Sequence, residues 1–347
     1  VQKAHERGMK VVLDAVYNHT GREFFAFADI LENGEKSKYR DWYFIDGFPL
    51  KSEWGEIPNF KCFGYYGGMP KLNLKNPEVE KYITDVACYW IKECDIDGWR
   101  LDVGDEISHF FWKNFRKAVK AVKKDMLIIG EIWHYAGDFL EGDEWDTVMN
   151  YPFYLNLIDL LADEKITVSQ FVQNLGYLKG RLHKNCYPLM WNLIDSHDTA
   201  RFLHLCNDNK KKQHLAAAFQ LLLPGMPMIY YGDEYAMPGA NDPDCRRGMY
   251  WDEEYQDKEM YEWYKRLIQV RKSHACIVEG ELAGSVTEDE EGTVVLIRKN
   301  GEETIAMIFN CSSSAKKFNE YTQKYNLLTE NTFDGNVEGF DAAVIVL

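Results

Sequence analysis

Short apolar runs alternate along most of the chain with longer segments in which apolar residues recur every three to four positions. The short runs predict strands at residues 10–16, 96–101, 127–131, 145–149, 189–194 and 228–231. The longer segments predict helices at 77–93, 110–124, 168–178 and 210–223. Because strands that alternate with helices are typical of parallel βαβ units, the pattern predicts an α/β fold.

Polar residues recur where the predicted strands end. They are Asp14 with Asn18 and His19, then Arg100 with Asp102, then Glu131, and finally His197 with Asp198. A (β/α)8 barrel builds its site from several strand ends on one face. An open doubly wound sheet would concentrate its chemistry at one switch point, usually with a glycine-rich phosphate loop, and the sequence holds no GxGxxG or Walker pattern. The pattern therefore favours a TIM barrel.

The strand count indicates an incomplete barrel. Six strands are predicted, whereas closure needs eight, so we expect two more strands to precede Val1. The chain opens in what reads as the end of a helix that stops near Gly8, without an N-cap ahead of it. A partial barrel exposes strand edges, and we therefore expect the chain by itself to be marginally stable.

Three regions follow from these patterns. Residues 1–274 are expected to form the incomplete catalytic barrel, and residues 275–347, with short β-like runs at 293–298, 304–309 and 342–347, a C-terminal antiparallel β-sandwich. Residues 20–76 form a B-like insert, and a segment of that length inside a compact domain is usually functional. The insert is rich in aromatic residues: Trp42, Tyr43, Phe44, Trp54, Phe60, Phe63, Tyr65 and Tyr66.

Composition narrows the classes of partner. The chain has 347 residues with 40 basic and 55 acidic side chains, a formal net charge of −15, which disfavours binding to nucleic acid. No apolar run reaches the roughly 18–20 residues that span a bilayer. The eight cysteines are scattered without a CxxC pair, which disfavours a zinc site and favours reduced thiols in the cytoplasm. Any targeting signal would precede Val1.

Three carboxylates at predicted strand ends are suited to glycoside cleavage, which needs an acid and a second carboxylate across the bond. Arg100 lies two residues before Asp102, so both side chains point the same way, and the cation favours the ionised form that a nucleophile needs. Glu131 follows an apolar run and precedes Trp133, surroundings that raise the pKa of a carboxyl toward that of a general acid. His19 and His197 offer donors for sugar hydroxyls.

Each of these residues has a simpler interpretation when taken alone. An aspartate after a strand is more often a turn former or a helix N-cap. Arg100 could pair with a structural carboxylate, and Trp133 could pack in the core. The joint occurrence of Asp102, Glu131 and Asp198 in this order, each with suitable neighbours, favours the functional interpretation.

Four segments resemble the four ordered sequence regions of the α-amylase family of glycoside hydrolases. They are 14–19 (DAVYNH), 98–106 (GWRLDVGDE), 131–134 (EIWH) and 192–198 (NLIDSHD). The segment 69–73 (MPKLN) resembles the fifth region of the neopullulanase, cyclomaltodextrinase and maltogenic amylase branch. Segments 230–234 (YYGDE) and 241–246 (NDPDCR) are also similar to that branch.

The resemblance implies a role for each matching residue. Asp102 would be the nucleophile that forms a β-glucosyl-enzyme, Glu131 the acid/base, and Asp198 the carboxylate that stabilises the transition state. Trp133 would serve the leaving side. Such enzymes retain the anomeric configuration, which places the two reacting carboxyls about 5–5.5 Å apart. The implied substrate-binding residues are Asp14, His19, Arg100, Trp133, His197, Asp242 and Arg246.

The chain also departs from the family pattern. It lacks the sugar-stacking tyrosine of the second barrel strand and the N-terminal domain usual in the branch, and Asp195 and Ala200 stand where glycine and proline are more usual. Asn18 occupies a position that binds calcium in some family members. No aspartate cluster completes such a site, so we expect no required cofactor, with calcium as the open alternative.

The function expected is a retaining α-glucan hydrolase that acts on α-1,4 bonds of maltodextrins, cyclodextrins or pullulan. An α-glucan transferase of the same family is the first alternative, because Glu106 rather than a Lys-His pair follows the nucleophile region. A non-catalytic amylase-like binding subunit is the second, and the three carboxylates argue against it. The expected partners are α-glucan oligosaccharides, with a homodimer as an open expectation for the full-length protein.

Overall fold

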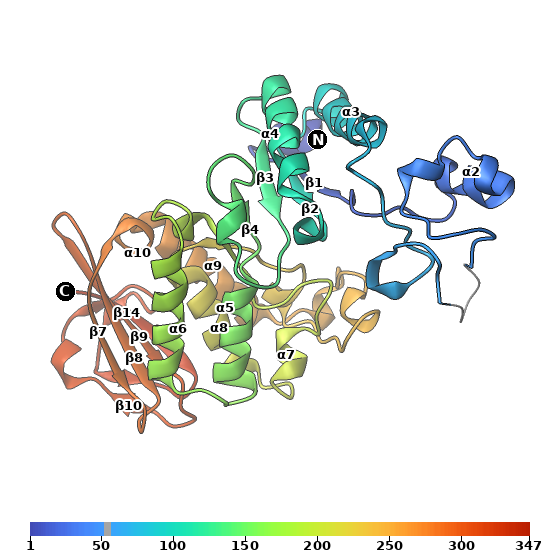
Figure 1. Ribbon diagram of the computed structural model, residues 1–347. Helices are drawn as coiled ribbons and strands as arrows, with labels where there is room; N and C mark the ends of the chain where they lie inside the picture. The colour runs from blue at the N-terminus through green and yellow to red at the C-terminus, as the bar shows by residue number, and fades with distance from the viewer. Residues whose placement is uncertain (52–56) are drawn as a thin grey trace. The chain divides into compact units, whose positions relative to one another are not determined.

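The computed structural model describes residues 1–51 and 57–347 (Figure 1). Two compact units make up this part of the chain. The first comprises Val1–Ile132 and Ala136–Met149, and the second Trp133–Tyr135 and Asn150–Leu347. Trp54, one of the aromatic residues expected in the insert, lies outside the described residues.

The first unit is built on a four-stranded parallel sheet in the order β1-β2-β3-β4. Its strands are β1 (Val12–Ala15), β2 (Gly98–Leu101), β3 (Leu127–Gly130) and β4 (Thr147–Val148). Two of the predicted helices connect them, α3 (Pro77–Cys94) before β2 and α4 (His109–Val122) before β3, and a short α1 (Gln2–His5) precedes β1. This sequence of strands and helices confirms the parallel βαβ pattern.

The register of this sheet aligns the strand ends that carry polar side chains. In the parallel ladder, Asp14 of β1 lies opposite Arg100 of β2, and Arg100 lies opposite Ile129 of β3. Asp102 and Glu131 each follow the last residue of a strand, so their backbones lie at the same edge of the sheet. The edge predicted to hold the chemistry is therefore formed by consecutive strands.

The segment between β1 and α3 has a small core of its own. It contains α2 (Phe25–Asn33) and three 3₁₀ turns, η1 (Gly34–Lys36), η2 (Arg40–Trp42) and η3 (Phe63–Tyr65). The Phe27 ring contacts Tyr43 and Phe60, with ring centroids 5.0 and 5.2 Å apart, and all three side chains are buried. Isolated bridges such as His19 with Lys71 tie the end of the segment back to the residues after β1.

The second unit begins with helices and holds the other two parallel strands, β5 (Trp191–Asn192) and β6 (Met226–Pro227). The predicted strand at 228–231 is wrong, because β6 ends at Pro227. The Gln220 side chain donates to the Met228 carbonyl at 2.7 Å, and Gly232 turns the chain at φ 90°. The helices are α5 (Tyr151–Leu157), the π-helical η6 (Ile158–Ala162), α6 (Val168–Arg181), α7 (Phe202–Leu205), α8 (Lys210–Leu222), α9 (Lys258–Ser273) and α10 (Ala275–Glu279).

An antiparallel sheet of six strands follows α10 in the order β12-β11-β14-β9-β8-β7. One of its faces packs on α8, where the Phe219 and Phe309 rings stack at 4.2 Å. The other face packs on the two-stranded β10-β13 sheet through Ile308, Phe318 and Val337. The strands are β7 (Glu281–Glu288), β8 (Thr293–Asn300), β9 (Glu303–Asn310), β10 (Lys316–Lys317), β11 (Tyr325–Asn326), β12 (Asn331–Thr332), β13 (Asn336–Val337) and β14 (Asp341–Val346).

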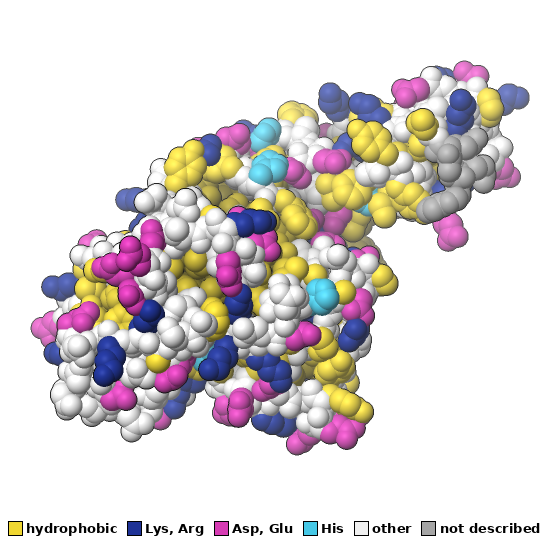
Figure 2. All heavy atoms as spheres, turned by 90° about the horizontal axis from the view of Figure 1, so that it is seen from below, with side chains coloured by type: hydrophobic (Ala, Val, Ile, Leu, Met, Phe, Trp, Pro, Cys, Tyr) yellow, Lys and Arg dark blue, Asp and Glu magenta, His cyan; other side chains and the backbone are white. Residues whose placement is uncertain are grey.

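The C-terminal antiparallel sheet is thus confirmed, whereas the domain boundary at residue 274 stays a prediction. Acidic and basic side chains are interspersed on the face seen in Figure 2. Among the residues that the structure describes, no helix is both long and apolar enough to cross a bilayer.

Candidate active site

Arg100 is the centre of a cluster of charged side chains in the first unit. Arg100 is a residue of β2, and its side chain is largely buried. Nη1 lies 3.0 Å from Asp14 Oδ1 and 2.9 Å from Asp102 Oδ1, and Nη2 lies 2.6 Å from Glu131 Oε1. The structure therefore brings three predicted site residues, Asp14, Asp102 and Glu131, around a fourth, Arg100.

Glu131 is held on both sides of its carboxylate. Besides the ion pair with Arg100, its Oε2 accepts a hydrogen bond from the Val103 N–H at 2.9 Å. Val103 is in the left-handed region with φ 46°, a conformation that is costly for a β-branched residue and typical of functional sites. The apolar surroundings predicted for Glu131 are thus only part of its environment, because Arg100 adds a cation that the sequence argument did not include.

The tight packing next to Glu131 depends on a glycine. A Cβ at Gly130 would lie 2.2 Å from Trp145, whose ring stacks on Phe139 at 4.0 Å. Trp145 is 1% exposed, so it has no room to move away. Core packing therefore fixes the position of the end of β3 and of the Glu131 backbone that follows it.

The electrostatic balance around Arg100 is negative. Burial alone would lower the pKa of this guanidinium, but the carboxylates of Glu131, Asp14 and Asp102 outweigh burial and raise it. One cation holds three carboxyl groups close together, and a negative charge remains at the strand ends even when Glu131 carries a proton. A site of this kind suits a developing positive charge on a bound substrate.

His19 lies near the same cluster. Burial lowers the pKa of His19, and this effect exceeds the opposite influence of Asp102 and Glu106. A neutral imidazole has one donor and one acceptor nitrogen, as a sugar hydroxyl requires. The ring stacks on Phe63 of the insert at 5.2 Å, which fixes its plane.

Lys71, from the MPKLN segment, occupies the position of a cation beside Asn18. Its Nζ donates to Asn18 Oδ1 at 2.5 Å and lies 2.8 Å from Glu106 Oε2, while Asn18 Nδ2 donates to Glu106 Oε2 at 3.2 Å. Groups of three or more acidic, His or Cys side chains that could hold a metal ion are absent from the described part of the chain. The lysine ammonium already binds the Asn18 oxygen, and the expectation that no cofactor is required stays a prediction.

A second cluster of predicted residues lies in the second unit. His197 Nε2 lies 3.1 Å from Asp198 Oδ2, and Arg246 Nη2 lies 3.3 Å from Asp198 Oδ1. Arg246 also donates to the His197 carbonyl at 2.9 Å and pairs with Asp242 at 2.8 Å. The loop after β5 and the segment after β6 thus present these four side chains together.

Trp133 belongs to the second unit as well. Its ring stacks on Tyr151 at a centroid distance of 4.0 Å and remains 41% exposed. The Tyr151 hydroxyl lies 3.2 Å from Ser196 Oγ, one residue before His197. Tyr151 therefore connects the aromatic platform with the loop that carries Asp198.

Two residues of these clusters, one in each unit, are absent from the predicted set of site residues. Tyr151 was missed because its surrounding pattern, Asn150-Tyr151-Pro152, reads as the start of a helix, which it also is. Lys71 was recognised only as part of a motif, since its role depends on contacts with residues far away in the chain. The separation of the Asp102 and Glu131 carboxyls stays a prediction.

Comparison with known proteins agrees with the fold and with these motifs. A family model described as the α-amylase catalytic domain matches residues 1–256. The fold is therefore that of a glycoside hydrolase with TIM-barrel-like parallel strands, as predicted. The chain belongs to the α-amylase family.

Relatives with assigned names are close. A cyclomaltodextrinase of Geobacillus thermopakistaniensis is 46% identical over 315 residues, which are 91% of this chain and 53% of that protein. Neopullulanase 2 of Thermoactinomyces vulgaris is 42% identical over 311 residues, 89% of this chain and 53% of that protein. The chain thus spans about half the length of the curated relatives it matches.

A solved structure of a cyclomaltodextrinase is also similar. It superposes with a TM-score of 0.94 at 37% identity and covers 99% of this chain and 61% of its own.

Proposed function

We propose that the protein is a retaining α-glucan hydrolase that cleaves α-1,4 bonds of maltodextrins, cyclodextrins or pullulan. The observation that carries the proposal is the convergence of Asp102 and Glu131 on Arg100, at adjacent strand ends. Membership of the α-amylase family and the names of the relatives support this choice of substrate.

In the first step, the protonated Glu131 gives its proton to the glycosidic oxygen while an Asp102 oxygen attacks C1 of the glucose. The C1–O bond to the leaving sugar breaks, and a β-glucosyl ester with Asp102 forms. Arg100 Nη1, 2.9 Å from Asp102 Oδ1, holds the attacking carboxyl group in position before attack.

In the second step, Glu131 takes a proton from water, which attacks C1 from the opposite face. The ester bond breaks, the Asp102 carboxylate is restored, and the product keeps the α configuration. Asp198, oriented by His197 and Arg246, is assigned to the hydroxyls of the reacting glucose. His19, Asp14, Asp242 and Trp133 are assigned to substrate binding.

We also place this activity in the cytoplasm. All eight cysteines are free, as expected for a reducing compartment.

The test compares the wild type with Asp102→Asn and Glu131→Gln, each checked for folding by circular dichroism. On maltotriose, we expect a fall in kcat on the order of 10³-fold or more for both variants, because each loses a group that acts in the transition state. The wild-type product measured by NMR should be the α anomer. A β anomer, or full activity of Asp102→Asn, would refute the mechanism, and products longer than maltotriose would indicate glucan transfer.

A further inference from the structure

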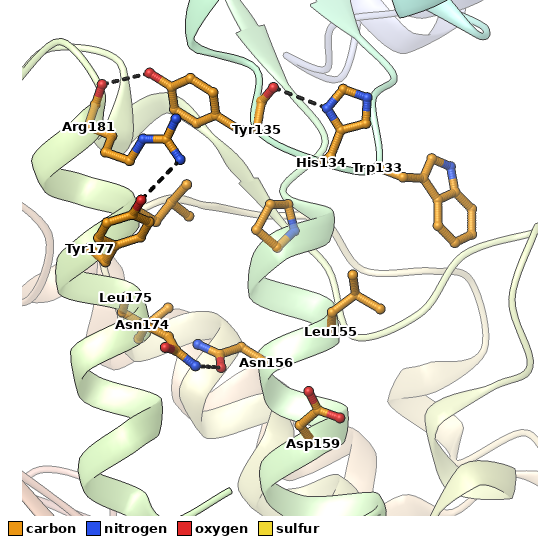
Figure 3. Close-up of a pocket in the computed structure, with 12 residues that line it drawn as sticks. Trp133, His134, Tyr135, Leu155, Asn156, Asp159, Asn174, Leu175, Tyr177 and Arg181 are labelled. Atoms are coloured by element: carbon orange, nitrogen blue, oxygen red, sulfur yellow. Dashed lines mark hydrogen bonds between the residues drawn. The ribbon is translucent and has the colours of Figure 1, made fainter. Parts of the chain in front are cut away.

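A pocket outside the charged clusters lies between α5, α6 and the segment Trp133–Tyr135 (Figure 3). Its volume is about 390 Å³, which falls within the range of small-molecule sites. Every residue that lines it belongs to the second unit. Trp133, assigned above to the leaving side, forms one end of the lining.

A stack of two tyrosines and one arginine forms one wall of the pocket. The Arg181 guanidinium lies 3.9 Å from the Tyr135 ring centroid and 5.3 Å from that of Tyr177. Tyr135 Oη donates to the Arg181 carbonyl at 2.8 Å, and Arg181 Nη1 donates to Tyr177 Oη at 3.4 Å. These contacts hold the rings in place, although the Tyr177 side chain is 67% exposed.

Two amides form a polar part of the lining, Asn174 on the same helix as Tyr177 and Asn156 on α5 (Figure 3). Asn174 Nδ2 donates to Asn156 Oδ1 at 2.8 Å, and Asn156 Nδ2 donates to the Phe171 carbonyl at 3.4 Å. The Asp159 carboxylate lies beyond Asn156, in η6, and also lines the pocket (Figure 3). Leu155 of α5 and Leu175 of α6 add apolar surface to the lining.

This lining suits a neutral ring that carries many hydroxyls. Arg181 and Asp159 balance each other in charge, and the guanidinium is already engaged by two rings, which disfavours a phosphate ligand. Exposed aromatic faces pack on the apolar faces of a sugar, while amide and carboxylate groups bind its hydroxyls. The Tyr177 ring is mostly exposed and buries little surface, so a contribution to the stability of the fold does not by itself explain its fixed position.

We propose that this pocket, formed by Tyr135, Tyr177, Arg181, Asn174 and Asp159, binds glucose units of the leaving part of a long α-glucan. The inference rests on the proposed function. Trp133 is assigned to the leaving side of the substrate and also lines the pocket. A glucan bound on the exposed Trp133 ring therefore continues into the pocket. The pocket therefore favours long substrates over short ones.

The experiment measures kcat/KM for maltoheptaose and for p-nitrophenyl α-maltoside in the protein as its gene encodes it. The ratio compared is kcat/KM for maltoheptaose divided by kcat/KM for the maltoside. Tyr177→Ala should lower this ratio about tenfold, mainly by raising KM for maltoheptaose. Tyr177→Phe should keep the ratio near that of the wild type, since it keeps the ring. The matched control is Tyr89→Ala in α3, which removes a tyrosine of similar exposure outside the pocket and should leave the ratio unchanged.

The outcomes separate the two proposals. An active wild type whose ratio does not change in Tyr177→Ala overturns the pocket and leaves the hydrolase intact. A folded wild type that cleaves neither substrate overturns the proposed function and the pocket with it. A fall in the ratio that Tyr177→Phe restores supports the pocket and excludes a general loss of folding.

Discussion

Asp195, Arg201 and Asp233 form a buried ionic cluster on the loops that follow β5 and β6. Each of the three side chains is 1% exposed or less. Arg201 Nη1 lies 3.1 Å from Asp233 Oδ1, Asp195 Oδ2 accepts from the Phe202 N–H at 2.7 Å, and the two carboxyl groups interact electrostatically. Burial raises the pKa of both carboxyl groups, the charge of Asp195 raises the pKa of Asp233 further, and Arg201 only partly opposes these effects.

This cluster predicts a particular pH dependence of stability. Burial raises the pKa of Asp195 to about 6 from an ordinary value of 3.8. Between these values the native state keeps a proton that the unfolded chain has lost, so the free energy of unfolding falls as the pH rises. Asp195→Asn removes this titration. The melting temperature of the variant relative to the wild type should therefore increase from pH 4 to pH 6, and a constant difference would contradict the raised pKa of Asp195.

At the same scale, the sequence identified single residues well where neighbours in the chain supply the context. Arg100 with Asp102 was predicted because the two lie on one strand, two residues apart. Asp195 was recognised as unusual, but its partner Asp233 lies in a different loop, and no local pattern connects them. Pairing of this kind depends on the tertiary fold.

At the scale of elements, the Lys71 side chain connects the insert with the segments that follow β1 and β2. Its ammonium binds Asn18 after β1 and Glu106 after β2, and Asn18 is 1% exposed. A cation fixed to the chain thus joins three segments that are distant in sequence.

Lys71→Met should lower the free energy of unfolding by about 1–3 kcal/mol, since the buried Asn18 oxygen loses its donor. Dialysis against EDTA should leave the wild-type melting temperature unchanged. Chemical denaturation checks the first result and thermal melting the second. The control for the substitution is Lys81→Met, which removes an exposed ion pair in α3. In the second test, a marked loss of stability in EDTA would show that a metal ion contributes.

Helices were easier to predict than strands. The starts of α3, α4, α6 and α8 agree with the prediction within one residue, because Asn76, Ser108, Thr167 and Asn209 cap them with their side chains. β7 was missed because it is an edge strand with a mostly exposed, polar pattern. β6 was misplaced since its apolar residues continue past the end of the ladder.

At the scale of the whole molecule, periodicity alone indicates the alternation of parallel strands and helices, and short motifs at strand ends indicate the family. Periodicity did not lead to α5, α7, α9 and α10, which lie outside the predicted helices. The division of the chain into two units was not predicted. It depends on packing that no local pattern records.

The free cysteines allow a test on the whole chain. Cys206 is buried, and burial raises the pKa of its thiol to about 12. Ellman's reagent should therefore react with fewer than eight thiols in the native protein and with all eight after denaturation. Dithiothreitol should leave the melting temperature unchanged, whereas fewer than eight thiols in the denatured, unreduced chain would reveal a disulfide.

The contact of Trp145 with Gly130 has a consequence for how this protein can vary. Residue 130 has no functional group, yet any larger residue there would displace the peptide that carries the proposed proton donor. A survey of tolerated substitutions would thus rank this glycine with the reacting carboxylates, and its intolerance would come from steric exclusion rather than from chemistry.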